Sequence, residues 1–385
     1  MIAADSNDLI ERFKADFGAV FKIKDLGPVK RIVGIEIQRD RKSRTLTIHQ
    51  RQFIDELLQE FDCASVKSSG SKVPMLDMKA TERTKIDEPR ADEGIYRRIV
   101  GKLLWLTRQT RPDIAFTVSK LARHMAQPAA RHLDAVFHLL RYIRTTKQLC
   151  ITYGPNTKHC TLTGYSDANF APAEEDRSST AGYVFRLYGA PVAWKSALLK
   201  NITISTCEAE FCGISEAARA GIPLNRLLSE LNCAELQNTK ETIRSASKIV
   251  PLYMLGDNEA APSITQGKCG LGRVKHVDTH YRYALQRCQR DELSIDYVPT
   301  ADMVADGLTK PLAGMQFATF VHQLGLSGGS VETPVADRSH GRPHSAMSAR
   351  VMSGSTTVSG PQTASLRWRL LPRSDRPDWC IASAD

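Results

Sequence analysis

The order of strand-forming and helix-forming segments between residues 160 and 298 restricts the fold more than any other feature of this chain. Short segments rich in strand-forming residues are predicted at residues 160–166, 180–187, 191–196, 249–255 and 293–298. A long segment at residues 205–231 separates the third strand from the fourth and carries apolar side chains at helical spacing. Three antiparallel strands, a helix and two further strands predict an α/β domain built on a mixed sheet.

Four acidic residues lie at strand ends and helix starts of this region, namely Asp167, Glu208, Asp257 and Asp306. Carboxylates that converge within a few ångströms repel one another strongly in a low dielectric, so they need a countercharge. Divalent metal ions are the usual solution, and carboxylate oxygens favour Mg²⁺ or Mn²⁺. If the fold brings the four residues together, they indicate a metal-dependent site for phosphodiester cleavage.

Each of these acids also has a purely structural explanation. Ser205 and Glu208 have the spacing of a helix capping box. Asp257 follows a glycine at a strand end, where turn residues are common, and Asp306 could be a solvated helix residue. Glu210 competes with Glu208, because positions two apart on a helix point about 200° apart and both are not expected to reach one metal site. Helix geometry alone leaves that choice open.

Composition narrows the class of protein and of partner. The chain has 385 residues, a formal net charge of +10 and a pI of about 9.1, which favours an anionic partner such as nucleic acid. The alternative is a basic protein with no polyanionic partner. Nine cysteines without a C-x-x-C pair indicate reduced thiols, and neither a signal peptide nor an apolar run of membrane-spanning length is visible. We therefore expect a soluble intracellular protein without a membrane partner.

The rest of the chain divides into segments of different character. Residues 1–75 predict a helix, strands and a second helix, and residues 76–95 read as a polar linker containing Pro89. Residues 96–150 predict helices with basic side chains outside an apolar stripe. Residues 155–324 hold the α/β domain. The last segment, residues 325–385, is rich in serine and arginine and lacks lysine, so we expect it to be disordered.

Short motifs along the chain resemble the ribonuclease H domain of copia-type LTR-retrotransposon Pol polyproteins. They are Y-R-R-I-V-G at 96–101, T-R-P-D-I at 110–114, G-Y-S-D-A at 164–168, R-S-S-T-A-G-Y at 177–183, V-A-W-K-S at 192–196, S-T-C-E-A-E-F at 205–211, D-N at 257–258, K-H-V-D at 275–278 and D-G-L-T-K-P at 306–311. Residues 6–75 are similar to the C-terminal part of the reverse transcriptase of the same polyproteins, with K-D-L-G at 24–27 and V-G-I-E-I at 33–37.

The resemblance implies an RNase H-like mixed sheet with flanking helices, preceded by an incomplete reverse transcriptase palm and thumb and a helical connection. It implies an endonuclease that hydrolyses the RNA strand of RNA–DNA hybrids with two Mg²⁺ ions, or Mn²⁺, held by Asp167, Glu208, Asp257 and Asp306. The family pattern favours Glu208 over Glu210. The polymerase aspartate pair of the family lies upstream of the segment that this chain matches, so we expect no DNA synthesis by this chain alone.

The motifs also suggest contacts to substrate. Candidate phosphate ligands are Arg177, Lys195, Lys275 and His276, although each could be ordinary surface charge. Trp194 is expected to belong to the core. Many ribonucleases H carry a loop histidine shortly before the last aspartate, but residues 297–304 contain none, which predicts slow product release. The alternative function is a catalytically weak or inactive nucleic-acid-binding remnant of a transposable element. Further expected partners are other parts of the polyprotein, in a cytoplasmic virus-like particle or the nucleus.

Overall fold

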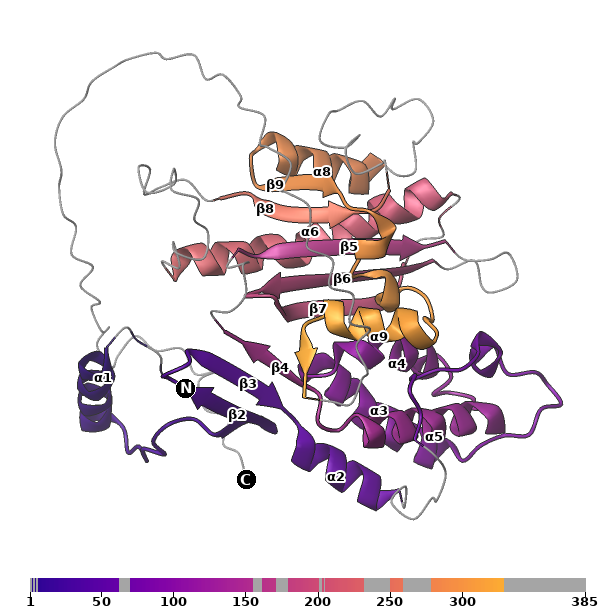
Figure 1. The fold of residues 1–385 in the computed structure, drawn as a ribbon, viewed down its shortest axis with the longest axis horizontal. Coiled ribbons are helices and arrows are strands. Elements are labelled where there is room, and N and C mark those ends of the chain that lie inside the picture. Colours follow the sequence, from indigo (N-terminus) through magenta and orange to yellow (C-terminus); the bar gives the residue numbers. More distant parts are fainter. Residues whose placement is uncertain are drawn as a thin grey trace, which may run out of the picture. The chain divides into compact units, whose positions relative to one another are not determined.

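The structure is a computed structural model that describes residues 2, 4, 6–61, 70–154, 161–170, 179–200, 203, 205–231, 250–258 and 278–328 (Figure 1). All of these residues fall within one compact unit, residues 1–335. The segment from residue 329 onward, most of the expected tail, lies outside the described residues. Residues 325–328, which were expected to begin the disordered tail, are described by the structure and continue the fold. None of the described helices is long and apolar enough to cross a membrane.

The larger sheet confirms the expected mixed α/β architecture. Its strands are β5 (Thr163–Asn169), β6 (Thr180–Leu187), β7 (Ala190–Leu198), β8 (Leu252–Gly256) and β9 (Leu293–Tyr297). They lie in the order β7-β6-β5-β8-β9 (Figure 1). The first three pair antiparallel, and β8 and β9 run parallel to β5. Strand β5 is therefore central, and its carboxyl end lies beside that of β8.

Helices cover both faces of this sheet. Successive side chains of a strand point to opposite faces, so neighbouring residues of β6 pack in two different clusters. On β6, Phe185 packs with Phe211 and Ile214 of α6 (Thr206–Glu230) and with residues of α8 (Asp278–Gln289). Its neighbour Val184 belongs to a second cluster, formed mainly by helices of residues 93–145 and by α9 (Gly314–Gln323). Both side chains are fully buried. The sheet is thus the middle layer of three.

The helical region that precedes the sheet packs directly on it. It contains α3 (Glu93–Gln109), α4 (Ala115–Ala122) and α5 (Ala130–Thr145). Trp194 of β7 donates a hydrogen bond from Nε1 to the main-chain oxygen of Thr107, at 2.7 Å, and its ring packs against the helical core. Trp194 therefore lies against the core, as the sequence favoured.

A smaller antiparallel sheet joins strands of the N-terminal segment to a strand at residues 326–327. Its strands, in order, are β1 (Arg31–Ile32), β2 (Ile35–Asp40), β3 (Thr45–His49), β4 (Cys150–Tyr153) and β10 (Leu326–Ser327). The helices α1 (Asn7–Val20) and α2 (Arg51–Glu60) flank these strands in sequence. Because β3 and β10 both pair with β4, residues 45–49 and 326–327 are held by the same strand.

A buried ion pair fixes the turn between α3 and α4. Arg111 is fully buried and binds Asp113 through two hydrogen bonds of 2.9 and 2.7 Å. Tyr142 donates to the same carboxylate at 2.7 Å, and Thr146 accepts from the guanidinium through both its main-chain oxygen and its hydroxyl. Every charge of this pair is thus compensated inside the helical core.

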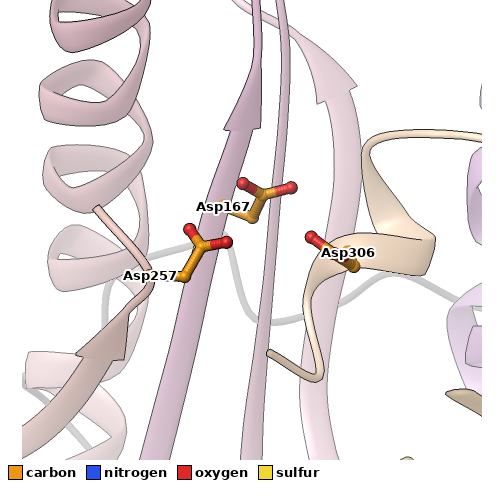
Figure 2. A group of neighbouring side chains, drawn as sticks. All are labelled: Asp167, Asp257 and Asp306. Carbon is orange, nitrogen blue, oxygen red and sulfur yellow. The ribbon is translucent and has the colours of Figure 1, made fainter. Parts of the chain in front are cut away.

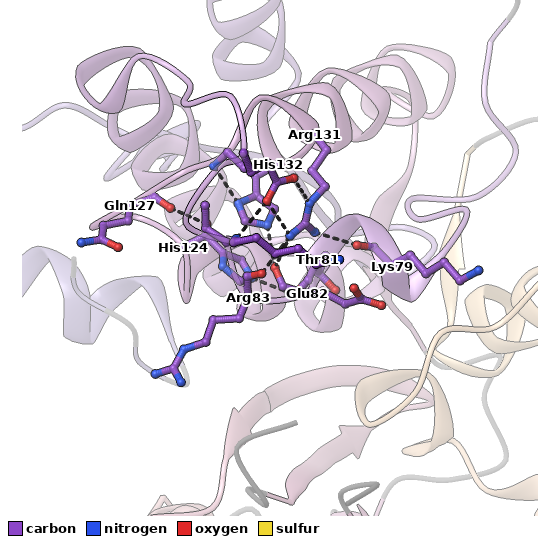
Figure 3. A network of polar contacts seen from close by, with 12 residues as sticks. Lys79, Thr81, Glu82, Arg83, His124, Gln127, Arg131 and His132 are labelled. Carbon is purple, nitrogen blue, oxygen red and sulfur yellow. Dashed lines mark hydrogen bonds and ion pairs between the residues drawn. The ribbon is translucent and has the colours of Figure 1, made fainter. Parts of the chain in front are cut away.

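The segment predicted as a linker, residues 76–95, is held against α4 and α5 by a polar network (Figure 3). Arg131 donates to the main-chain oxygens of Lys79, Glu82 and Arg83 and pairs with the carboxylate of Glu88. Two stacked imidazoles, those of His124 and His132 with ring centroids 3.9 Å apart, bind the oxygens of Thr81 and Glu82. We call these two residues the histidine pair.

Candidate metal centre

Three of the four predicted carboxylates converge at the carboxyl ends of the central strands. Asp167 lies in β5, Asp257 directly follows β8, and Asp306 begins a short 3₁₀ helix, η7 (Asp306–Leu308). One carboxylate oxygen of each lies within 4.8 Å of the others (Figure 2). The register explains the meeting, because β5 and β8 are parallel neighbours whose carboxyl ends share one edge of the sheet.

The structure places Glu210 beside Asp167 and Asp257, so we prefer Glu210 to Glu208 as the fourth carboxylate of the site. Glu210 lines a cavity of about 620 Å³ together with Asp167 and Asp257, and the main-chain N–H of Ala168 donates to its carboxylate. Glu208 instead begins the helix as expected of a capping position, with its N–H donating to the Ser205 hydroxyl at 3.1 Å.

The helix phase gives the reason for this difference. One turn after Glu210 stands Ile214, in the cluster that contains Leu252 and Met254 of β8. One turn after Glu208 stands Cys212, in the cluster that contains Ala168 of β5, Ala181 of β6 and Leu199. Burial, followed by the charge of Glu208, raises the pKa of the Cys212 thiol to about 11. Glu208 and Glu210 therefore stand on different flanks of α6.

Burial and neighbouring charges act together on the pKa values of these acids. Burial raises the pKa of Asp167 to about 6, and the neighbouring charges of Asp306 and Asp257 add to this effect. Burial also raises the pKa of Glu210 to about 9, again with contributions from Asp167 and Asp257. Like charges and poor solvation both disfavour ionised carboxylates, so the group carries unfavourable negative charge at neutral pH.

Two consecutive residues partly compensate this charge. The hydroxyl of Thr309 donates to Oδ2 of Asp167 and lies 3.0 Å from the main-chain oxygen of Asp306. The ammonium of Lys310 lies 2.8 Å from Oδ2 of Asp306. Burial alone would lower the pKa of Lys310, but its hydrogen bond to Asp306 and the charges of the aspartates raise that pKa overall. Neither residue was predicted as part of the site.

The donor set fits a hard divalent cation. Oδ1 of Asp306 is buried and has no hydrogen-bond partner among the described residues, so it is free to bind a ligand. The converging donors are carboxylate oxygens, which suit Mg²⁺ or Mn²⁺. The three aspartates and Glu210 would hold the metal.

The predicted substrate contacts are not brought to this group where the structure describes them. Lys195 lies on β7 with its Nζ 3.6 Å from Glu216, and it lines a second cavity with Tyr183 and Arg219. Arg177, Lys275 and His276 lie outside the described residues. Glu210 was weighed against Glu208 in the sequence, but helix geometry left that choice open.

The fold and the site together define an α/β domain on a mixed five-stranded sheet with a candidate metal centre. No family model matches the chain. It is 30% identical, over 85% of its length and 24% of the relative, to the retrovirus-related Pol polyprotein from transposon TNT 1-94 of Nicotiana tabacum. It is 32% identical, over 56% of its length and 69% of the relative, to the putative transposon Ty5-1 protein of Saccharomyces cerevisiae. The chain belongs to the family of retrovirus-related Pol polyproteins of copia-type transposons.

The relatives also set the scale of the match. The chain spans about a quarter of the length of the tobacco polyprotein (24%) and 21% of that of the transposon RE1 polyprotein of Arabidopsis thaliana, to which it is 28% identical over 85% of its own length. Among solved structures it is similar to RNase H1 of Halobacterium salinarum, with 16% identity, a TM-score of 0.25, and coverage of 38% of this chain and 93% of that one.

Proposed function

We propose that this chain is a metal-dependent ribonuclease that hydrolyses the RNA strand of RNA–DNA hybrids as part of a retrotransposon polyprotein. The observation that carries the proposal is the convergence of Asp167, Asp257 and Asp306 within 4.8 Å, with one buried oxygen of Asp306 that has no hydrogen-bond partner in the described part of the chain. Membership of the Pol polyprotein family supports the choice of nucleic acid as substrate.

The residues of the site have separable tasks in this proposal. Asp167 is the central ligand, because it couples electrostatically to both other aspartates and to Glu210. Thr309 fixes the orientation of the Asp167 carboxylate through its hydrogen bond. Two bound divalent ions would supply an activated water and stabilise the leaving oxygen of the RNA phosphate. Glu210 completes the ligand set from the helix side.

The cavity beside the carboxylates offers groups that can recognise RNA. Asn169 and Asn258 line it together with Asp167 and Asp257. A carboxamide both donates and accepts hydrogen bonds, as does a ribose 2′-hydroxyl, which DNA lacks. We therefore assign selection of the RNA strand to this cavity, next to the reacting phosphate.

Cleavage of a labelled hybrid tests the proposal. The wild-type chain should degrade the RNA strand of an RNA–DNA hybrid with Mg²⁺, and should leave the strand intact with EDTA or when the duplex is DNA alone. Asp167→Asn should abolish cleavage, whereas the matched change Asp134→Asn, at an exposed position of α5, should not. Undiminished, metal-dependent cleavage by Asp167→Asn would sink the assignment. Hybrid binding with no metal-dependent cleavage by the wild type would favour the alternative, a nucleic-acid-binding remnant.

A further inference from the structure

Asp306 is held by a cation of its own chain before any metal arrives. Its Oδ2 lies 2.8 Å from the ammonium of Lys310, while its Oδ1 is buried without a hydrogen-bond partner among the described residues. We propose that Lys310 is an internal counterion that competes with a divalent ion for Asp306 and so sets the metal affinity of the site. This inference rests on the metal centre of the proposed function.

The position of Lys310 allows it to act on the whole group. The charges of Asp306, Asp167 and Asp257 all act on its ammonium. Its side chain is 39% exposed, while the Asp306 side chain is only 15% exposed. The pair therefore has one end in the buried carboxylate group and one end near water. A lysine in this place neutralises part of the negative charge, and its partly exposed side chain can rotate away from the carboxylates into water.

Thr309 and Lys310 together organise the site in the absence of metal. These neighbours bind aspartates that come from different elements, with Thr309 on Asp167 and Lys310 on Asp306. Without the lysine, like-charge repulsion would act against the convergence of the carboxylates. With it, the ligands are held close together, and a metal that uses Asp306 has to displace the ammonium. The lysine thus favours an assembled site at the expense of metal affinity.

The chemistry of lysine suits a counterion that must leave. Its ammonium is a compact point charge on a flexible stem with rotatable donors, whereas the planar guanidinium of arginine matches a carboxylate in a bidentate fork. Displacement therefore needs only rotation of the Lys310 side chain. Once displaced, the ammonium stays tethered beside the carboxylates through its backbone and continues to repel the bound cation.

Metal titration of charge variants tests this role without any measurement of cleavage. Lys310→Met should lower the dissociation constant for Mn²⁺. This constant is measured by calorimetry and by electron paramagnetic resonance of the free ion. Even in bulk water, repulsion between a single charge and a divalent ion about 6 Å apart corresponds to about a tenfold change in affinity. The same variant should show a larger rise in unfolding temperature with added Mn²⁺.

Lys147 provides a matched control. Its Nζ lies 2.8 Å from Oδ1 of Asp55 and its side chain is 38% exposed, so this lysine resembles Lys310 in its own exposure and in the distance to its carboxylate, although Asp55 is more exposed than Asp306. Lys147→Met should leave the Mn²⁺ affinity unchanged. Lys310→Gln is a second neutral variant if the methionine variant folds poorly, and Lys310→Arg should keep Mn²⁺ binding as weak as in the wild type, or weaker.

The outcomes separate this inference from the proposed function. If the wild type binds Mn²⁺, Asp167→Asn does not, and both neutral variants at Lys310 bind no tighter than the wild type, the counterion role is overturned while the metal centre stands. If the wild type binds no Mn²⁺ at the aspartates, the metal centre and the counterion role both fail. Tighter binding by the neutral variants, with Lys147→Met unchanged, supports the inference.

Discussion

Replacement of Glu210 by glutamine should remove activity and at the same time stabilise the metal-free protein. Glu210 is 8% exposed, and burial together with Asp167 and Asp257 raises its pKa from 4.5 to about 9. A carboxyl with a raised pKa contributes its full stability below its unfolded pKa and loses that contribution as the pH rises towards its folded pKa. At pH 7.5 this titration lowers the free energy of unfolding of the wild type. Glutamine does not titrate, so Glu210→Gln does not lose that free energy.

The buried, acidic surroundings of Glu210 set the size of the gain in stability and of the loss in cleavage rate. Each pH unit above 4.5 costs the wild type about 1.4 kcal/mol, so the glutamine variant should gain between about 1 and 4 kcal/mol at pH 7.5. Bound metal supplies several kcal/mol of charge stabilisation, and loss of about 3 kcal/mol of it slows cleavage about 100-fold. Urea denaturation in EDTA measures the first effect, and initial rates on an RNA–DNA hybrid with Mg²⁺ measure the second.

Glu208→Gln is the matched comparison, because it changes the same side chain two residues earlier in α6. We expect it to leave the cleavage rate within about threefold of the wild type, since Glu208 belongs neither to the converging aspartates nor to the lining of their cavity. The assignment of Glu210 would be refuted if Glu208→Gln lost activity while Glu210→Gln kept it. It would also be refuted if Glu210→Gln destabilised the metal-free protein, because inactivity would then reflect misfolding.

Three further changes test other parts of the fold. Asp113→Asn should destabilise the protein by about 3–5 kcal/mol in urea denaturation, because it leaves the buried guanidinium of Arg111 uncompensated. Burial lowers the pKa of both members of the histidine pair, so stability should be lost as the pH falls from about 6.5, and proteolysis within residues 78–92 should be faster at pH 5 than at pH 7.5. Gly307→Ala would place a Cβ 2.6 Å from the Phe320 ring; cleavage should fall, whereas Gly101→Ala, with open space around it, should leave cleavage unchanged.

Local sequence signals predicted the strands of the sheet, whereas the four acids were chosen by the order of motifs that resemble a family, and three of them converge. The segments predicted at residues 160–166, 180–187 and 191–196 correspond to β5, β6 and β7, with boundaries shifted by a few residues. Asp167 and Asp257 follow from strand order, because carboxyl ends of neighbouring parallel strands meet at one edge of a sheet. Such contacts are encoded by short-range patterns, which a single sequence displays directly.

The choice between Glu208 and Glu210 needed information that motif order does not contain. Both residues are buried, at 6% and 8% exposure, so burial of the helix start does not distinguish them. What distinguishes them is which flank of α6 faces the cavity of Asp167 and Asp257, and this depends on how the helix packs on the sheet. The partners Thr309 and Lys310 were missed for the same reason, since their contacts with Asp167 and Asp306 appear only when η7 is placed on the sheet.

The boundary drawn between residues 150 and 155 does not mark a break in the hydrophobic core. Val184 of β6 and Leu308 of η7 belong to the same cluster as Leu103 and Leu139 of the helical region. Consecutive buried residues on β6 indicate that this sheet needs a covering layer on both faces, and α6 with α8 supplies only one. The second layer comes from residues that helical periodicity and the family resemblance assign to a separate connection. Because the loop of Asp306 lies between that layer and the sheet, the geometry of the metal centre depends on helices that contribute none of its ligands.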